Sequence, residues 1–346
     1  MSLSAEITKD FGGFVLDVKL EAGNEVLALL GASGSGKSLT LQTIAGIFTP
    51  DKGRIILDGR TLFDSRERIN LPTQKRHCGL MFQSYALFPN MTAEGNLLAP
   101  VHSLPKPERS SLAASMLELF GLSEVRKHYP SQLSGGQRQR TALARMLLAK
   151  PGIIMLDEPF SALDQHIRQD TEGYLLEVFR NFGGTVILVS HDSGEVFRLA
   201  DRVAVINDGR IEACGTKHEI FTSPPTRTAA ILTGCRNISR AERSETNEIF
   251  ASDWGITLRL PLREGVKFVG VRSRDIRPSS DCEGQNVFRC TVAGVVEDTA
   301  SFTVTLRPEG TCGSLCMDIP KDQWAVISSD SMNIYLPEKS ILQLKE

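Results

Sequence analysis

Short apolar runs recur through the first two thirds of the chain and alternate with segments of helical periodicity. Three of them, Val26–Leu30, Ile153–Leu156 and Val186–Val189, have the length of buried strands, well short of the roughly eighteen residues that span a bilayer. Runs of this kind between Glu25 and His191 favour a parallel sheet covered by helices. We therefore predict an α/β fold for this part of the chain.

Each of the three runs leads into a polar or glycine-rich segment. The first is followed by Gly31–Ser38, the second by Asp157-Glu158, and the third by Ser190-His191. Ligands bind at the carboxyl ends of strands in open parallel sheets. We therefore expect these three segments to converge.

Asp-Gly pairs and one helical pattern complete the first part of the chain. Asp58-Gly59 and Asp208-Gly209 each separate two short β-rich runs, which predicts hairpins and antiparallel strands added to the parallel sheet. The segment Ser110–Phe120 has the spacing of a helix, with apolar positions at Leu112, Met116, Leu119 and Phe120.

The pattern changes around Pro224-Pro225, where small polar residues indicate a linker. Beyond Asn237 short β-rich segments such as Val287–Val292 and Phe302–Leu306 are separated by Gly, Asp and Ser. Such spacing favours a small all-β barrel or sandwich. We predict one domain over residues 1–233 and a second, all-β domain over 234–346.

Composition excludes some partners. The chain has 346 residues, 41% of them hydrophobic, and a formal net charge of −2, so no general basic field is present to hold nucleic acid. The first residues lack the pattern of a signal peptide, so we expect a cytosolic protein whose seven cysteines are free thiols. Cys312 and Cys316 have a spacing that allows a metal site, but no His lies near them.

Gly31–Ser38 fits a phosphate-binding loop, which reads Gly, four residues, then Gly-Lys-Ser. Glycines let backbone N–H groups close around phosphate oxygens, the lysine reaches the β- and γ-phosphates, and the serine hydroxyl ligates Mg²⁺. The expected ATP-binding residues in this loop are Gly31, Ser33, Gly34, Ser35, Gly36, Lys37 and Ser38.

Three further residues suit hydrolysis of a nucleoside triphosphate. Asp157 ends an apolar strand, where phosphate-loop enzymes hold Mg²⁺ through a carboxylate. Glu158 follows it, and neighbouring side chains of an extended chain point apart, so Glu158 is free to orient or deprotonate water. His191 ends the third strand and is expected to hydrogen-bond the γ-phosphate. Gln83 is uninformative from its chemistry alone.

A second glycine-rich helix start, Leu133–Gln137, is unexplained by one phosphate site. The hydroxyl of Ser134 and the N–H groups of Gly135 and Gly136 suit a γ-phosphate. Gln137, the next residue, is included in this candidate binding segment. The simplest interpretation is that the Leu133–Gln137 segment binds the nucleotide held by another molecule.

With these motifs in order, residues 1–230 resemble the ATP-binding cassette (ABC) family. The resemblance implies a head-to-tail homodimer, with each ATP between one subunit's phosphate loop and the other's Leu133–Gln137. It also implies that Glu158 is the general base, that Gln83 joins Ser38 and Asp157 at Mg²⁺, and that Asp164 belongs to the segment 161–164 at the nucleotide. An aromatic ring stacks on adenine, with Phe11 as the candidate and Phe14 as its competitor.

Further resemblances concern transport. Gln83–Gly95 resembles the segment of importer ATPases that docks a membrane permease, served indirectly by an extracytoplasmic solute-binding protein. Residues 234–346 resemble the oligonucleotide-binding-like (OB-like) regulatory domains of importer ATPases. Within them, residues 284–346 resemble the molybdate-binding (mop) type, with possible oxyanion ligands at Asn286, Lys339 and Ser340, although Gln285 replaces the usual basic residue. This implies a molybdate or tungstate importer subunit at the cytoplasmic face of the membrane. Sulfate, ferric iron, polyamine or sugar import, a non-transport ABC ATPase and an oxyanion sensor are the alternatives.

Overall fold

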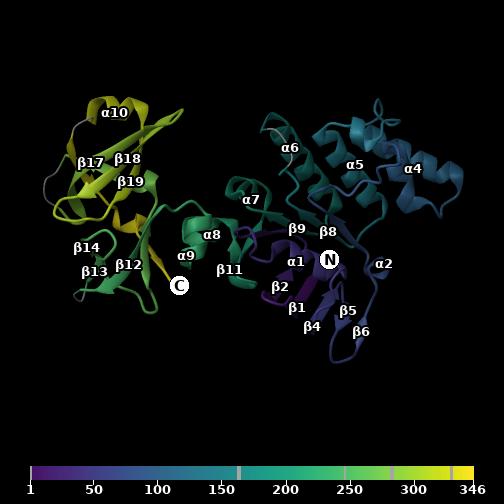
Figure 1. The fold of residues 1–346 in the computed structure, drawn as a ribbon, viewed down its shortest axis with the longest axis horizontal. Helices are drawn as coiled ribbons and strands as arrows, with labels where there is room; N and C mark the ends of the chain where they lie inside the picture. Colours follow the sequence, from purple (N-terminus) through teal and green to yellow (C-terminus); the bar gives the residue numbers. More distant parts are fainter. Residues whose placement is uncertain (1, 162–164, 245–246, 281–283, 328–329) are drawn as a thin grey trace. The chain divides into compact units, whose positions relative to one another are not determined.

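The computed structural model describes residues 2–161, 165–244, 247–280, 284–327 and 330–346. The chain divides into two compact units, Met1–Lys217 and His218–Glu346, which are treated separately below (Figure 1). The domain boundary predicted after residue 233 stays a prediction. Among the described residues no helix is long and apolar enough to cross a membrane.

A large mixed sheet forms the first unit, in the order β6-β5-β4-β1-β2-β11-β10-β3-β9-β8-β7. Its strands are β1 (Leu3–Asp10), β2 (Val15–Ala22), β3 (Val26–Leu30), β4 (Lys52–Leu57), β5 (Arg60–Asp64), β6 (Ile69–Asn70), β7 (Cys78–Met81), β8 (Ile153–Asp157), β9 (Thr185–Ser190), β10 (Arg202–Asn207) and β11 (Arg210–Thr216). Its α-helices are α1 (Lys37–Ala45), α2 (Thr73–Arg76), α3 (Ala93–Leu98), α4 (Lys106–Leu119), α5 (Gly135–Leu148), α6 (Gln165–Phe182) and α7 (Ser193–Leu199). Short 3₁₀ turns are η1 (Ala99–Val101) and η2 (Pro130–Gln132).

The parallel core of this sheet confirms the predicted convergence. Strand β9 lies between β3 and β8, and all three run parallel. The register pairs Leu30 with Ser190 and Val189 with Asp157, so the three strands end at nearly the same level. Strand β7 continues the parallel order beyond β8 and leads to Gln83.

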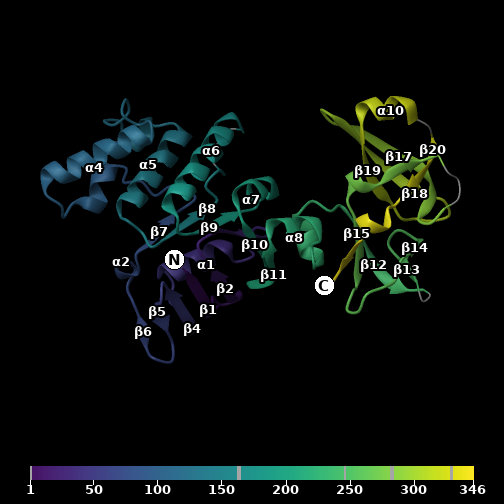
Figure 2. The same ribbon diagram turned by 180° about the vertical axis from the view of Figure 1, so that it is seen from behind.

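Alternating side chains of the central strands divide the core into two layers. Ile154 and Leu156 pack with residues of α5 and α6, whereas Ile153 and Met155 pack with residues of α1. All four are fully buried, as expected for a parallel strand covered on both faces. Helices α1 and α5 therefore lie on opposite faces of the sheet (Figures 1 and 2).

Both predicted hairpins are present. Asp58 and Gly59 have φ of 49° and 75° between β4 and β5, and Asp208 and Gly209 have φ of 44° and 77° between β10 and β11, the left-handed pair of a type I′ turn. The predicted helix is also present as α4, but its apolar stripe is partly wrong, because Leu119 is 63% exposed.

The second unit begins with two short helices and continues as a two-sheet β structure. Its helices are α8 (Lys217–Thr222), which starts at the last residue of the first unit, α9 (Arg227–Leu232) and α10 (Lys321–Ile327). One sheet, β14-β13-β12-β15-β21, contains β12 (Asn237–Arg243), β13 (Glu248–Ala251), β14 (Ile256–Arg259), β15 (Phe268–Val271) and β21 (Leu342–Leu344). The other, β16-β20-β17-β18-β19, contains β16 (Arg277–Ser279), β17 (Val287–Glu297), β18 (Ser301–Pro308), β19 (Leu315–Pro320) and β20 (Ser331–Tyr335). The turns are η3 (Ser273–Asp275) and η4 (Glu338–Ser340).

One hydrophobic core joins the two sheets of the second unit. Leu258 and Val269 from the first sheet and Val304 and Ile334 from the second belong to the same buried cluster. The predicted all-β, OB-like class of this region is thus confirmed.

Candidate nucleotide site

The glycines of the phosphate loop are required by close packing and by backbone conformation. A Cβ on Gly31 would lie 2.4 Å from the carbonyl oxygen of Ile206 and 2.5 Å from Ser35 Oγ. Gly34 and Gly36 have φ of +82° and +103°, which side chains rarely adopt. The loop therefore runs against β10, and Gly36 is the N-cap of α1.

The Lys37 side chain folds back onto the start of the phosphate loop. Its Nζ donates hydrogen bonds of 2.8 Å to the carbonyl oxygens of both Gly31 and Ala32. Burial lowers the pKa of Lys37, while the charges of Glu158 and Asp157 act in the opposite direction. Ser35 Oγ is buried and has no hydrogen-bond partner among the described residues, so the loop retains an unsatisfied hydroxyl.

Ser38 and Asp157 form the pair expected of a magnesium site. Ser38 Oγ donates a 2.8 Å hydrogen bond to Asp157 Oδ1. Burial raises the pKa of Asp157, an effect that Glu158 adds to and the Ser38 hydroxyl opposes. One hydroxyl and one carboxylate fit Mg²⁺, which takes few protein oxygens and completes its shell with phosphates and water. Among the described residues, no group of three or more His, Cys, Asp or Glu side chains is placed to hold a metal ion.

Glu158 lies between the two other predicted catalytic residues. Its Oε1 is 3.2 Å from His191 Nδ1, and its Oε2 accepts a 3.4 Å hydrogen bond from Gln83 Nε2. The expectation of an extended chain here is wrong, because Glu158 has a φ of +46°. This left-handed residue turns its carboxylate toward Gln83 and His191, which follow β7 and β9, whereas Asp157 faces Ser38. Strained backbone of this kind is common at functional sites.

Ser134–Gln137 forms the start of α5 as a capping box. Ser134 Oγ accepts a 3.2 Å hydrogen bond from Gln137 N, and Gln137 Oε1 accepts a 2.9 Å bond from Ser134 N. Sequence reasoning did not assign this cap, although Ser-x-x-Gln is its signature. Because α5 and α1 cover opposite faces of the sheet, the structure does not bring this segment together with the phosphate loop.

The remaining predicted nucleotide contacts are the adenine-stacking candidates Phe11 and Phe14, and Asp164. Phe11 packs edge-on against Phe48 at 5.2 Å, and the Phe14 ring lies 3.0 Å from the position of a Cβ on Gly36. Both rings thus lie near α1, and the choice between them stays open. Asp164, with residues 162–163, lies outside the described residues.

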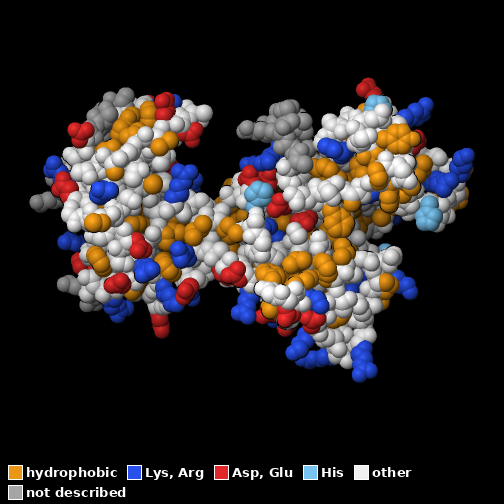
Figure 3. Space-filling view, viewed as in Figure 1, with side chains coloured by type: hydrophobic (Ala, Val, Ile, Leu, Met, Phe, Trp, Pro, Cys, Tyr) orange, Lys and Arg blue, Asp and Glu red, His pale blue; other side chains and the backbone are white. Residues whose placement is uncertain are grey.

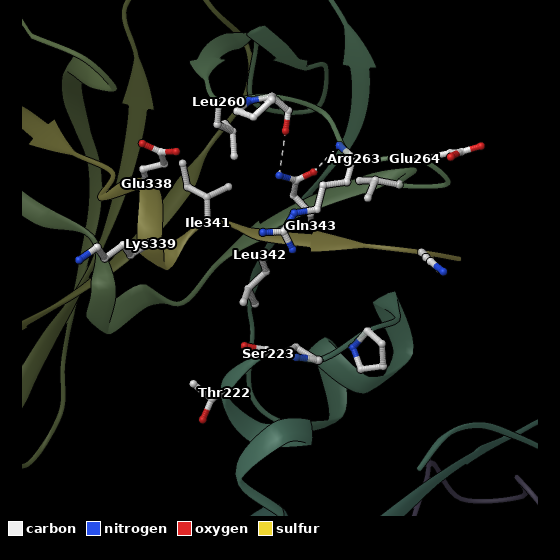
Figure 4. A pocket seen from close by; sticks show the side chains of 15 residues that line it. Thr222, Ser223, Leu260, Arg263, Glu264, Glu338, Lys339, Ile341, Leu342 and Gln343 are labelled. Carbon is white, nitrogen blue, oxygen red and sulfur yellow. Dashed lines mark hydrogen bonds between the residues drawn. The ribbon is translucent and has the colours of Figure 1, made fainter. Parts of the chain in front are cut away.

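Among the described residues, Asn286 and Lys339 have different surroundings in the second unit. Asn286 is buried with a φ of +57°, and its Oδ1 accepts a 2.7 Å hydrogen bond from Arg259 N. Lys339 lines a cavity of about 710 Å³ together with Glu338 and Arg263, while neither Asn286 nor Ser340 lines it (Figure 4). Gln343 spans the cavity wall through hydrogen bonds with Arg263 N and Pro261 O.

Tyr85 lies in the predicted docking segment Gln83–Gly95, but sequence reasoning did not single it out. It is buried with a φ of +63°, its hydroxyl donates a 3.4 Å hydrogen bond to Pro159 O, and its carbonyl oxygen accepts one from Arg145. It therefore connects the segment after Gln83 with the residue next to Glu158. Its nearness to Gln83 in sequence was the only available signal.

A phosphate loop, a hydroxyl–carboxylate pair and a carboxylate held by Gln and His define a P-loop ATPase. A family model described as "ABC transporter" matches residues 15–161. The chain belongs to the ABC transporter family, among its import-type ATPases. The cofactors of this family are ATP and Mg²⁺, in agreement with the site.

Curated relatives cover most of the chain but differ in substrate. An Fe(3+) ions import ATP-binding protein, FbpC, of Streptomyces coelicolor is 38% identical, with 88% of this chain and 86% of the relative covered. A sulfate/thiosulfate import ATP-binding protein, CysA, of Mesorhizobium japonicum is 36% identical, with 88% and 87% covered. A molybdenum import ATP-binding protein, ModC, of Paramagnetospirillum magneticum is 40% identical, with 65% and 62% covered.

Among solved structures, the dimeric post-hydrolysis state of the ATP-binding cassette MJ0796 bound to ADP and Pi is similar to this chain. It is 30% identical with a TM-score of 0.54, and the match covers 63% of this chain and 99% of that one. The covered share is close to the size of the first unit. The comparison supports the cassette fold that the sheet order defines.

Proposed function

We propose that this import-type ATPase works as a head-to-tail homodimer that drives a membrane permease, with molybdate or tungstate as the solute. The observation that carries the catalytic part is the position of Glu158 between Gln83 and His191, beside the Ser38–Asp157 pair.

In this proposal each side chain has one task. Lys37 neutralises phosphate oxygens, Ser38 and Asp157 hold Mg²⁺ with help from Gln83, and the backbone of the loop fixes the phosphates. Mg²⁺ supplies charge stabilisation for the transferred phosphoryl group. Glu158 orients the attacking water and accepts its proton, and His191 donates a hydrogen bond toward the γ-phosphate.

The homodimer is supported by the separation of the two anion-binding segments on opposite faces of the sheet. The exposed Ser134 and the following start of α5, Gly135–Gln137, would then complete the site of the other subunit, as would Asp164. A monomer would bind ATP but hydrolyse it poorly.

Mixing two inactive variants tests the dimer. Lys37→Ala disables each subunit's own phosphate loop, and Ser134→Arg disables what it offers to its partner. Because a mixed dimer keeps one intact site, the mixture should recover up to about a quarter of the wild-type rate. Ser131→Arg, at an exposed serine three residues upstream, is the matched control and should stay active alone. No recovery in the mixture would refute action between subunits.

A groove beside Tyr85 supports the proposed permease contact at Gln83–Gly95. It measures about 450 Å³ and is lined mainly by apolar residues, including Phe82, Ala86, Phe88 and Pro100. Phe88 is 44% exposed. Hydrophobic side chains gather on the surface over α4 and α5 (Figure 3). We propose that a permease helix occupies the groove, which places the protein peripherally at the cytoplasmic face of the membrane. Phe88→Asp should abolish transport and leave basal ATP hydrolysis unchanged.

The choice of solute rests on the second unit. Asn286, Lys339 and Ser340 match the mop pattern, but the relatives that cover this unit are named for iron and sulfate. Ferric iron and sulfate are therefore the competing solutes.

Uptake of labelled molybdate, sulfate and ferric iron should be compared in cells that lack the gene and carry either the wild-type chain or Glu158→Gln. The proposal expects molybdate uptake with the wild-type chain alone. Restoration of sulfate or iron uptake in its place would refute it. Calorimetric titration of the full chain with molybdate, with Lys339→Ala as control, tests the regulatory site separately.

A further inference from the structure

The turn that carries His191 is fixed by a buried polar network separate from the phosphate site. Ser190 ends β9 and is buried. Its Oγ donates a 2.6 Å hydrogen bond to Glu195 Oε2 and accepts one of 3.0 Å from Asp192 N. The Ser190 hydroxyl therefore connects the residue before His191 to the backbone of Asp192, the residue after it, and to Glu195 in the first turn of α7.

Glu195 is the centre of this network. It is only 4% exposed, and its Oε1 lies 3.3 Å from Arg168 Nη1 on α6. The same nitrogen is 3.3 Å from Asp192 Oδ2, while Asp192 Oδ1 caps α7 by accepting from Gly194 N and Glu195 N. Burial raises the pKa of Glu195, and the Ser190 hydroxyl and the Arg168 charge oppose that shift. A buried carboxylate with these partners holds a rigid position.

The His191 ring itself has little support. Its side chain is 58% exposed, and among the described residues its Nδ1 lies 3.2 Å from Glu158 Oε1. Its position beside Glu158 consequently depends on the backbone of the turn. Displacing a catalytic group by about 1 Å can lower a rate by about a hundredfold.

We propose that Glu195, acting through Ser190 and anchored by Arg168, is a positioning residue that holds His191 beside Glu158. The proposal rests on the function proposed above for His191. Because Arg168 belongs to the helix that follows Glu158 in sequence, the network also links α6 to the His191 turn.

A second ion pair between the same helices provides a matched control. Arg198 on α7 donates two hydrogen bonds, of 2.6 and 2.7 Å, to Glu172 on α6. Among the described residues Arg198 forms no hydrogen bond or ion pair with Ser190, His191 or Asp192, although the charges of Asp192 and Glu195 act on it at longer range. Loss of this pair removes a link between α6 and α7 while the His191 turn keeps its anchors.

A double-mutant cycle on the full-length protein separates positioning from general stability. Ser190→Ala and Glu195→Gln should each lower kcat at least about tenfold, with KM for ATP changed less than about twofold. In a His191→Ala background the same changes should alter the residual kcat less than about twofold. Glu172→Gln should leave kcat within about twofold of wild type. Losses that stay additive in the His191→Ala background would overturn the proposal.

A spectroscopic readout covers the case in which His191→Ala leaves too little activity to measure. The chain has six histidines, so the ring resonance of His191 can be assigned by its loss in His191→Ala. Ser190→Ala, which removes a single hydroxyl, should shift or broaden that resonance, and Glu172→Gln should not. An unchanged resonance in Ser190→Ala would overturn the positioning role. A wild-type kcat in His191→Ala would instead refute the role proposed for His191.

Discussion

Arg76 is a fully buried cation that connects the phosphate-loop helix α1 to the segment 70–71, and Arg76→Met should destabilise the first unit. The residue is 1% exposed. Its guanidinium donates to the carbonyl oxygens of Thr43 (3.2 Å) and Ile44 (2.8 Å) at the end of α1, and to Leu71 O (2.9 Å) and Asn70 Oδ1 (2.9 Å). Methionine keeps much of the volume but donates nothing.

The loss of stability in Arg76→Met depends on which acceptors of the Arg76 hydrogen bonds keep another donor. Thr43 O keeps a 3.1 Å hydrogen bond from Gly46 N, and Asn70 is exposed, so water can replace its lost partner. Ile44 O and Leu71 O are left without a donor, at about 1–3 kcal/mol each. Removing a buried charge offsets part of this cost, and burial already lowers the pKa of Arg76. We expect a loss of about 3 kcal/mol in the free energy of unfolding.

Urea unfolding with two probes tests this value. Both tryptophans, Trp254 and Trp324, belong to the second unit, so far-UV circular dichroism should report the change while tryptophan fluorescence keeps its midpoint. A loss of about 3 kcal/mol moves the midpoint by about 1–2 M urea. Arg60→Met, at an exposed arginine of β5, should change stability by less than about 0.5 kcal/mol. A similarly small change for Arg76→Met would refute the reasoning.

Three further changes have expected outcomes. Gly31→Ala should abolish ATP binding, measured by calorimetry, because its Cβ would lie 2.4 Å from Ile206 O. Asp157→Asn should weaken binding of Mg²⁺-ATP yet raise the thermal midpoint of the nucleotide-free protein at pH 7. Since burial raises the pKa of Asp157, its charge opposes folding above the ordinary carboxyl pKa, and this gain should vanish as the pH falls into that range. Tyr85→Phe should reduce transport per ATP hydrolysed, measured with reconstituted permease, because the hydrogen bond to Pro159 O is lost.

The local sequence pattern was sufficient to predict the elements whose conformation depends mainly on their own residues. The Asp-Gly pairs predicted both hairpins, since their φ values require residues that tolerate the left-handed region. The apolar runs predicted the central strands because both faces of those strands are buried. The helix at Ser110–Phe120 was predicted less well, because Pro107 near the true start at Lys106 was not used as a start signal.

Tertiary neighbours decided what the sequence could not predict. The left-handed turn at Glu158 has no signal in its two acidic residues, because it depends on the bond from Glu158 N to Val189 O across the sheet. The Arg168–Glu195 pair likewise requires α6 and α7 to lie side by side. In the second unit, Asn286 matched an oxyanion pattern, but its side-chain oxygen is engaged by the backbone of β14.

The register of the parallel strands explains why these dispersed residues meet. Pairing of Leu30 with Ser190 and of Val189 with Asp157 brings Gly31, Glu158 and His191 out of the sheet at adjacent strand ends. A slip of one residue in this register would shift the strand ends by about 3.3 Å relative to one another and separate these residues. The register of the apolar strands thus brings Glu158 and His191 close together, and the positive φ of Glu158 directs its carboxylate to the 3.2 Å contact with His191. The hydrophobic pattern that predicts the fold therefore also determines the geometry of the proposed catalytic pair.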